Sequence, residues 1–179
     1  MPEVQIRPAI AADLSPLQAI DHSCQTDYVW QMDVQHEDGQ LGAIFREIRL
    51  PRSVSVSYPR SINLLSETWN RRSGILVAAI GEQAVGYART NDVILPHTAW
   101  LVDLVVAPRF RRKGVGSALV LAVQSWAAER KDRRILLEMQ SKNSPAIRLA
   151  QKLGYEFCGY NDQYYEKQDI ALFFGRSIR

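Results

Sequence analysis

The chain contains little cysteine. Only Cys24 and Cys158 occur in its 179 residues, they lie far apart, and neither belongs to a pair with metal-ligand spacing. A disulfide scaffold and a zinc-finger type of fold are therefore excluded, and we expect no metal site. Because intracellular proteins rarely keep disulfides, both cysteines are predicted to be buried free thiols.

Long apolar runs are also missing. No segment approaches the roughly eighteen apolar residues of a membrane span, and residues 1–7 lack the apolar core of a signal peptide. These absences predict a cytoplasmic protein that does not act at a membrane. No internal repeat or low-complexity tract is present, and the 46% hydrophobic and 23% charged residues suit a single globular domain over residues 1–179.

The chain carries little net charge, but positive side chains are concentrated at one point. The formal net charge is only +3, and no wide basic face with interleaved aromatic residues is visible, so we expect no nucleic-acid partner. Four cations nevertheless stand within five positions, at Arg109, Arg111, Arg112 and Lys113. Such a density suits a polyanion, for example the phosphates of a cofactor.

The hydropathy pattern predicts a succession of short strands and helices. Period-two and short apolar runs indicate strands, whereas apolar residues spaced three and four apart indicate helices, the first of them capped by Asp13. Strands are expected at 4–7, 75–80, 84–90, 99–106, 135–139, 155–158 and 170–174, and helices over 14–20, 114–130 and 144–153.

Residues 25–70 are the hardest to assign. They mix aromatic and turn residues, and we predict a helix over 41–49, ended by Pro51, followed by irregular or edge-strand chain. Long irregular segments within a domain are often functional. We therefore expect this region to face a substrate.

The basic cluster joins the strand over 99–106 to the longest predicted helix. A helix N-terminus offers unpaired backbone N–H groups and the positive end of its dipole, and so binds phosphate. Gly114 and Gly116 let a pyrophosphate approach the backbone closely. A Rossmann-type loop does not fit, because Leu119 stands where the third glycine is needed.

Arg111, Gly114 and Gly116 resemble the acetyl-CoA signature of the GNAT acetyltransferases. A second match follows at the distance found in that family, in Asn143, Ala146, Leu149, Lys152, Gly154 and Tyr155. The specific motifs fall within residues 99–159, and 25–70 is taken as the acceptor-facing region. The resemblance implies that acetyl-CoA contacts Leu104, Val105, Val106, Arg111, Arg112, Lys113, Gly114, Val115, Gly116, Ser117, Asn143, Ala146 and Lys152.

The resemblance also implies the fold class, α/β of the α+β kind. A single GNAT-type domain has a mixed, mostly antiparallel central sheet of six to seven strands, which is splayed at the cofactor site and flanked by helices. In such a domain backbone groups of Leu104, Val105 and Val106 pair with pantetheine, and one N–H polarises the acetyl carbonyl.

Transfer to an amine also needs a proton acceptor, because a protonated amine has no lone pair. Glu138 lies among apolar neighbours in the strand over 135–139 and matches the base of bacterial ribosomal-protein N-terminal acetyltransferases. A structural or substrate-binding carboxylate is the other interpretation of Glu138. Asp103, in the strand beside the thioester, is the competing base.

One departure from the family pattern concerns the acid. Many members carry a tyrosine that protonates the leaving thiolate seven residues after the motif asparagine, where this chain has Ala150. Tyr155, Tyr160, Tyr164 or Tyr165 is a candidate substitute. A CoA thiolate can also leave unassisted, because its pKa resembles that of cysteine.

The sequence thus predicts an acetyl-CoA-dependent N-acetyltransferase that acts by direct transfer on a primary amine of a small molecule or peptide. Parts of the chain resemble streptothricin-type antibiotic acetyltransferases, and others resemble ribosomal-protein N-terminal acetyltransferases. The alternative is a non-catalytic acyl-CoA-binding or sensor domain of the same fold, and a homodimer is possible. Carboxylates that could hold a cationic acceptor are Asp27, Asp33, Glu37, Asp38, Asp162 and Glu166.

Overall fold

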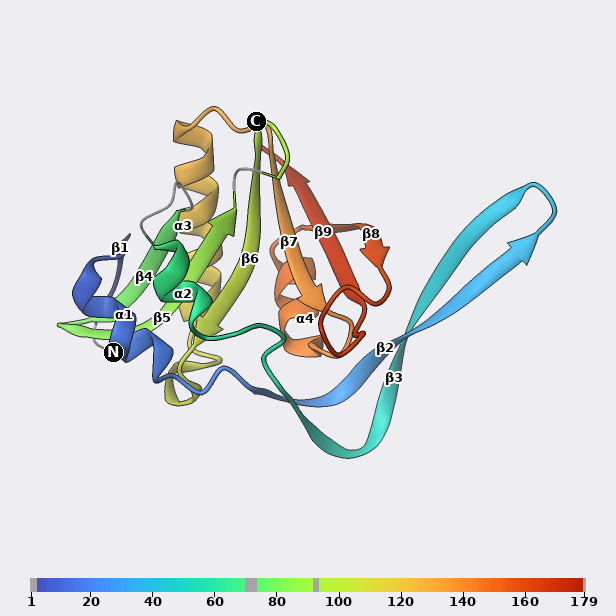
Figure 1. Cartoon of the computed structure of the whole chain (residues 1–179), viewed down its shortest axis with the longest axis horizontal. Helices are drawn as coiled ribbons and strands as arrows, with labels where there is room; N and C mark the ends of the chain where they lie inside the picture. Colours follow the sequence, from blue (N-terminus) through green and yellow to red (C-terminus); the bar gives the residue numbers. More distant parts are fainter. Residues whose placement is uncertain (1–2, 70–73, 92–93, 179) are drawn as a thin grey trace.

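The computed structural model describes residues 3–69, 74–91 and 94–178. The chain forms nine described strands, with helices between some of them (Figure 1). The strands are β1 (Val4–Pro8), β2 (Cys24–Glu37), β3 (Gln40–Val56), β4 (Ile75–Ile80), β5 (Gln83–Asn91), β6 (Thr98–Val106), β7 (Arg134–Gln140), β8 (Glu156–Asn161) and β9 (Ala171–Ser177). The helices are α1 (Ala11–Gln18), α2 (Leu64–Thr68), the short 3-10 turn η1 (Pro108–Phe110), α3 (Val115–Glu129) and α4 (Ser144–Lys152).

Seven of the strands form one mixed sheet in the order β1-β4-β5-β6-β7-β9-β8. Every neighbouring pair is antiparallel except β6 and β7, which run parallel. A parallel pair needs a crossover connection, and here α3 supplies it. The predicted α+β domain, with its mixed, mostly antiparallel sheet flanked by helices, is confirmed.

The sheet opens between its two parallel strands. β6 and β7 are paired only from Thr98 with Arg134 to Leu101 with Leu137, so the later residues of both strands have no partner across the gap. The two ribbons diverge toward their carboxyl ends in Figure 1. The predicted splay of the sheet is therefore present, and it leaves backbone hydrogen-bonding groups facing an opening.

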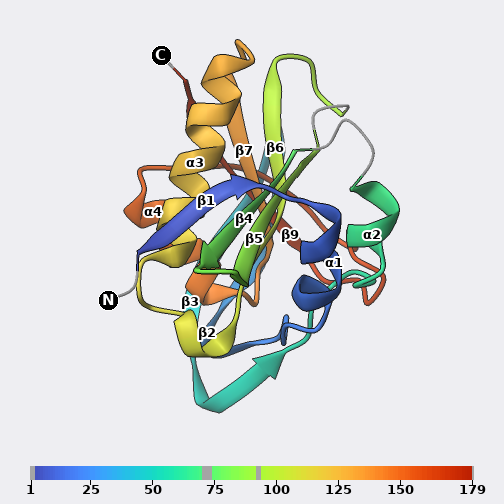
Figure 2. The same cartoon turned by 90° about the vertical axis from the view of Figure 1, so that its left-hand side faces the viewer.

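The helices cover both faces of the sheet. Successive side chains of a strand point to opposite faces, and in β4 Leu76 and Ala78 pack with α3 while Ile75 and Val77 pack with Leu17 of α1. Figure 2 shows α3 on one side of the sheet and α1 and α2 on the other. The sheet is thus buried in its middle, and β6 and β7 part within this buried layer.

The prediction of a helix over 41–49 is wrong. These residues belong to β3, which pairs with β2 in a long two-stranded antiparallel hairpin that projects from the body of the molecule (Figure 1). The two strands are joined by Asp38 and Gly39, and Gly39 has a φ of +75°. Asp-Gly at a two-residue connection is a strong hairpin signal. The spacing of Leu41, Phe45 and Ile48 is compatible with a helix, but this turn decides the local structure.

Pro51 does not end an element, as predicted, but lies within β3. The pairing register shifts between Thr26 and Tyr28, which pair with Val54 and Arg49 respectively. Pro51 falls in this irregular stretch, where β3 is not paired residue for residue. A proline is tolerated at such an irregularity because no ladder hydrogen bond requires its missing N–H.

Two smaller expectations also need correction. Asp13 is not the cap residue: α1 begins at Ala11, and the Asp13 carboxylate accepts a hydrogen bond from Ile10 N–H and pairs with Arg7 at 2.6 Å. Both thiols are free, but Cys24 is half-buried and Cys158 is exposed. No helix in the described part of the chain is long and apolar enough to cross a membrane.

The packing of α3 gives a test of the fold. Leu119 is completely buried in the core under α3, whereas Leu121 on the same helix is 48% exposed. Leu119→Ala should lower the free energy of unfolding by about 2–5 kcal/mol, because it removes transfer energy and leaves a cavity. Leu121→Ala should change it by less than about 0.5 kcal/mol. Urea denaturation of the two variants measures both values, and equal effects would contradict the packing described.

Candidate active site

A cavity lies where β6 and β7 part. Its floor is formed by the separated ends of the two strands, and the segment that follows β3 closes it from above. His22 ahead of β2, Cys24 at its first position, and residues at and after the N-cap of α4 complete the wall. The lining residues are His22, Cys24, Val56–Arg60, Leu101–Val105, Leu137–Gln140, Asn143, Ala146, Leu149 and Tyr165.

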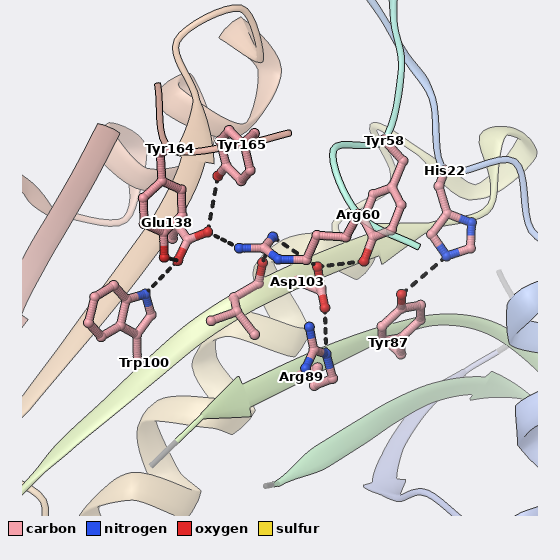
Figure 3. Close-up of polar contacts among 11 residues, drawn as sticks. His22, Tyr58, Arg60, Tyr87, Arg89, Trp100, Asp103, Glu138, Tyr164 and Tyr165 are labelled. Carbon is pink, nitrogen blue, oxygen red and sulfur yellow. Dashed lines mark hydrogen bonds and ion pairs between the residues drawn. The ribbon is translucent and has the colours of Figure 1, made fainter. Parts of the chain in front are cut away.

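Glu138 is the most heavily hydrogen-bonded carboxylate of the cavity. Its side chain is fully buried. Oε2 accepts hydrogen bonds from Trp100 Nε1 and from the Tyr164 hydroxyl, both at 3.0 Å, and Oε1 accepts one from the Tyr165 hydroxyl at 3.1 Å. Oε1 also pairs with Arg60 Nη2. Four donors therefore hold this carboxylate in one orientation (Figure 3).

Asp103 is the second buried carboxylate, with a side chain that is 1% exposed. Oδ2 pairs with Arg89 Nε at 2.5 Å, and Oδ1 accepts a hydrogen bond from the Tyr58 hydroxyl at 2.6 Å. Arg89 and Asp103 face each other on paired strands, β5 and β6. Since the two opposite charges are in register within the sheet, this ion pair is part of the framework of the site.

Arg60 connects the two carboxylates. Its guanidinium donates to Glu138, lies 3.4 Å from Asp103 Oδ1, and donates to the Val102 carbonyl oxygen at 3.1 Å. Burial alone would lower the pKa of Arg60, but the negative charges of Glu138 and Asp103 outweigh it and raise that pKa. The guanidinium therefore stays charged, and it joins the two strands across the opening.

An aromatic group continues the site toward the segment between α1 and β2. His22 Nδ1 lies 2.6 Å from the carbonyl oxygen of Ile20, so Nδ1 carries the hydrogen, and Nε2 lies 3.1 Å from the Tyr87 hydroxyl. The ring of Tyr58 lies 4.8 Å from that of His22. Burial, and then the charge of Asp103, raise the pKa of both Tyr58 and Tyr87. Both phenols stay protonated and act as donors.

The four tyrosines named as substitute acids occupy different environments. Tyr155 is buried in the core and its hydroxyl accepts a hydrogen bond from Gln124, whereas Tyr160 is 40% exposed and packs on Phe45. Neither lines the cavity. Tyr164 and Tyr165, in contrast, both donate to Glu138. Ala150 itself is completely buried and contributes no polar group.

The basic loop leads into an open helix N-terminus. Gly114 is the residue before α3 and has a φ of +88°, a conformation that favours glycine. Ala118 donates to the Gly114 carbonyl at 2.9 Å, so the amides of Val115, Gly116 and Ser117 lie at the end of the helix that has no intrahelical partners. A Cβ at Gly116 would lie 3.3 Å from Leu149 of α4. The arrangement fits an anion.

The basic side chains of this loop divide into two groups. Arg111 donates to three backbone carbonyls, those of Val106 at 2.7 Å, Ser23 at 2.7 Å and Asp21 at 2.6 Å. It therefore fastens the loop to the segment before β2. Arg112 and Lys113 are exposed and remain available to an anion from solvent, and Lys152 is likewise exposed at the end of α4.

The remaining predicted cofactor residues lie along the cleft. Leu104 and Val105 line the cavity, whereas the Val106 carbonyl is engaged by Arg111. Asn143 is the N-cap of α4: its Oδ1 accepts hydrogen bonds from Ala146 N–H at 3.2 Å and from Cys24 Sγ at 3.5 Å. Ala146 also lines the cavity, so α4 presents a small residue there.

Sequence reasoning missed several residues of the site. Arg89 could have been found, because a charge within an otherwise apolar strand faces Asp103, another such charge, on the next strand. Arg60 and Trp100 gave no signal of this kind. Arg60 lies in irregular chain and meets Glu138, which is 78 positions away.

The six carboxylates considered for a cationic acceptor lie elsewhere. None of them lines the cavity. Asp27, Asp33 and Glu37 belong to the projecting hairpin, where Asp33 pairs with Arg46 at 3.2 Å. Within the described residues, no group of three or more His, Cys, Asp or Glu side chains is arranged to hold a metal ion. The carboxylates that do meet at the cavity are Asp103 and Glu138.

The chain is similar to several acetyltransferases in sequence and in fold. The streptothricin acetyltransferase of Streptomyces lavendulae is 27% identical to this chain over 168 residues, which cover 90% of this chain and 86% of that protein. The crystal structure of nourseothricin acetyltransferase matches with a TM-score of 0.82 at 23% identity and covers 98% of this chain and 99% of its own.

Other solved structures share the fold. A Bacillus anthracis protein described as a streptothricin acetyltransferase, solved with acetyl coenzyme A, matches with a TM-score of 0.79 at 22% identity and covers 98% and 99% of the two chains. The ribosomal-protein-S18-alanine N-acetyltransferase of Escherichia coli matches at 0.69 and 17%, with coverage of 98% and 94%. The model of the acetyltransferase (GNAT) family matches residues 42–155, more than half of the sequence. The chain belongs to the GNAT family and is an N-acetyltransferase.

Proposed function

We propose that the protein transfers the acetyl group of acetyl-CoA directly to a primary amine, with the chemistry at the cavity between β6 and β7. One observation carries the proposal. Two buried carboxylates, Asp103 and Glu138, meet where the parallel strands part, in a cavity whose lining residue Leu149 lies next to Gly116 at the N-terminus of α3. A buried carboxylate next to an opening in the sheet is suited to receive the proton of an attacking amine.

The amides ahead of α3 fit the pyrophosphate of acetyl-CoA. The N–H groups of residues 112–117 would bind it, with Arg112 and Lys113 adding positive charge. Leu104 and Val105 line the cavity beyond the last paired residue of β6 and β7, and backbone groups there would hold the pantetheine arm. When bound, acetyl-CoA supplies the acetyl group as a thioester. Arg111 supports the loop through its three carbonyl contacts, and its two remaining N–H groups would add to phosphate binding.

The acceptor is proposed by chemical class. The relatives include proteins named for streptothricin, nourseothricin and a ribosomal-protein alanine, and an amine acceptor is common to the N-acetyltransferases among them. For this chain the two carboxylates and the surrounding aromatic rings favour an amine that arrives as a cation. Glu138 then receives the proton, and Asp103, held by Arg89, adds negative charge to the site.

The pyrophosphate assignment is tested at Gly114. Gly114→Ala has open space around the new Cβ, but its φ of +88° is unfavourable for alanine by about 1–2 kcal/mol. The loop should relax, misalign its amides and weaken acetyl-CoA binding roughly tenfold, as measured by calorimetry. Gly81→Ala is the matched control, with a φ of +59° and equally open space in the turn between β4 and β5. Equal affinities for both variants would remove the basis of this assignment.

The function itself is tested by thiol release from acetyl-CoA across a panel of amines. The panel contains streptothricin, a polyamine, lysine and a peptide with an N-terminal alanine. At least one amine should stimulate release in the parent protein, and Glu138→Gln should lower that turnover by about a hundred- to ten-thousandfold with little change in acetyl-CoA affinity. Glu156→Gln, which changes an exposed carboxylate on β8, is the control. Acetyl-CoA binding without release by any amine would indicate a non-catalytic acyl-CoA-binding domain instead.

The substitute acid is tested at the tyrosines. Tyr165→Phe removes a donor to Glu138 at the cavity, and we expect turnover to fall roughly tenfold or more. Burial, and then the charge of Glu138, raise the pKa of Tyr165, so its hydroxyl is protonated at neutral pH. Tyr155→Phe and Tyr160→Phe should retain turnover within about twofold, because neither residue lines the cavity. Full activity of Tyr165→Phe and Tyr164→Phe would favour unassisted departure of the thiolate.

A further inference from the structure

The guanidinium of Arg60 lies in a set of groups that suits any organic cation. It contacts Glu138 Oε1, Asp103 Oδ1 and the Val102 carbonyl oxygen, and it lies 5.2 Å from the centre of the Tyr165 ring. Three oxygen acceptors and an aromatic face are the usual means of binding an ammonium or guanidinium group. We call these four groups the cation cage.

Charge balance shows that the cage needs one cation. Glu138 and Asp103 carry two negative charges on side chains that are 0% and 1% exposed. Arg89 compensates one of them through Asp103 Oδ2, and Arg60 compensates the other. A buried carboxylate without a partner is strongly destabilising. A cation in the place of the Arg60 guanidinium therefore stabilises the cage as long as Glu138 is ionised.

Arg60 is not fixed there by its own backbone. Residues 57–60 follow the end of β3 and belong to no helix or strand. In the described part of the chain, no backbone hydrogen bond outside helices and strands involves these residues. They are held instead by side chains: Arg60 itself, the Tyr58 hydroxyl on Asp103, and Lys167 Nζ, which lies 3.4 Å from Ser57 Oγ. A competing cation can thus displace the guanidinium without breaking an element of the fold.

The cage stands at the start of the gap between the strands. Pairing of β6 with β7 ends at Leu101. On the other side, β5 pairs with Leu101 and Asp103 but skips Val102, which is the extra residue of a bulge. The Val102 carbonyl is therefore free of the strand ladder and accepts from Arg60. An amine in this position would lie where the cleft begins, beside Leu104 and Val105.

We propose that Arg60 holds the place of the acceptor's ammonium group, and that a primary alkylammonium substrate displaces the guanidinium to bind in the cation cage. The inference rests on the proposed transfer to an amine and specifies how that amine is recognised. The three N–H donors of an alkylammonium match the oxygens of Glu138, Asp103 and Val102 that Arg60 uses. Glu138 is then in direct contact with the group whose proton it receives.

If Arg60 competes with the substrate, removing its charge should lower the KM for the amine and not raise it. Arg60→Met keeps a linear side chain but removes the internal cation, so a larger fraction of the protein is ready to bind substrate. The KM for the amine should fall roughly tenfold, and the affinity for acetyl-CoA should stay unchanged. Arg46→Met, which removes an exposed arginine on the projecting hairpin, should leave KM as in the parent. An unchanged or higher KM in Arg60→Met would overturn the proposal, because an arginine that supports the site or binds substrate gives that result.

A second measurement does not depend on turnover. Propylammonium chloride should raise the melting temperature of Arg60→Met in a saturable way, and should raise that of the parent protein much less, since the parent cage is filled. Potassium chloride at equal ionic strength is the control, and equal effects of the two salts on the variant would overturn the proposal. The melting-temperature measurement tests the cation cage even if no amine in the panel accepts an acetyl group. A panel without an acceptor would contradict only the proposed reaction.

A conservative variant covers the case in which Arg60→Met does not fold. Arg60→Lys retains one positive charge, but its tethered Nζ ends one bond short of the Nη atoms that reach Glu138, Asp103 and Val102 together. Its hold on the cage is weaker, so its KM for the amine should fall below that of the parent and above that of Arg60→Met. A KM of Arg60→Lys equal to or above the parent value would overturn the proposal.

Discussion

The early end of the pairing between β6 and β7 is the constraint on which the rest of the structure depends. Two parallel strands that stop pairing after Leu101 and Leu137 leave backbone groups exposed within the middle of a sheet. Such groups must find other partners. Arg60 and Arg111 satisfy two of the carbonyls of β6, at Val102 and Val106. The site therefore lies where the pairing of the sheet is incomplete.

The same opening explains the buried charges. A carboxylate is costly inside a sheet unless it is paired, yet Asp103 and Glu138 both lie at the gap. Arg89 reaches Asp103 from within the sheet, whereas Arg60 reaches both carboxylates from irregular chain outside it. One ion pair is therefore part of the sheet, and the other depends on residues 57–60, which belong to no helix or strand.

The sequence predicted those elements of the fold that have a clear local pattern. Periodicity and short apolar runs located β1, β4 to β9, α3 and α4. The prediction failed over 41–49, where the Asp38-Gly39 turn outweighs the helical spacing. In the site, Glu138 and Asp103 were recognised as carboxylates in apolar strands. Arg60 was not, since its contacts span 43 and 78 positions and leave no local trace.

Arg111 shows why a motif match and a contact have to be considered separately. The pattern that includes Arg111, Gly114 and Gly116 suggests that the arginine binds phosphate, but its three hydrogen bonds go to carbonyls of Asp21, Ser23 and Val106. Those bonds fix the loop to the segment that carries His22, which lines the cavity. One guanidinium therefore ties the loop ahead of α3 to the chain segment ahead of β2. The first position of the motif acts here as a structural link between these two segments.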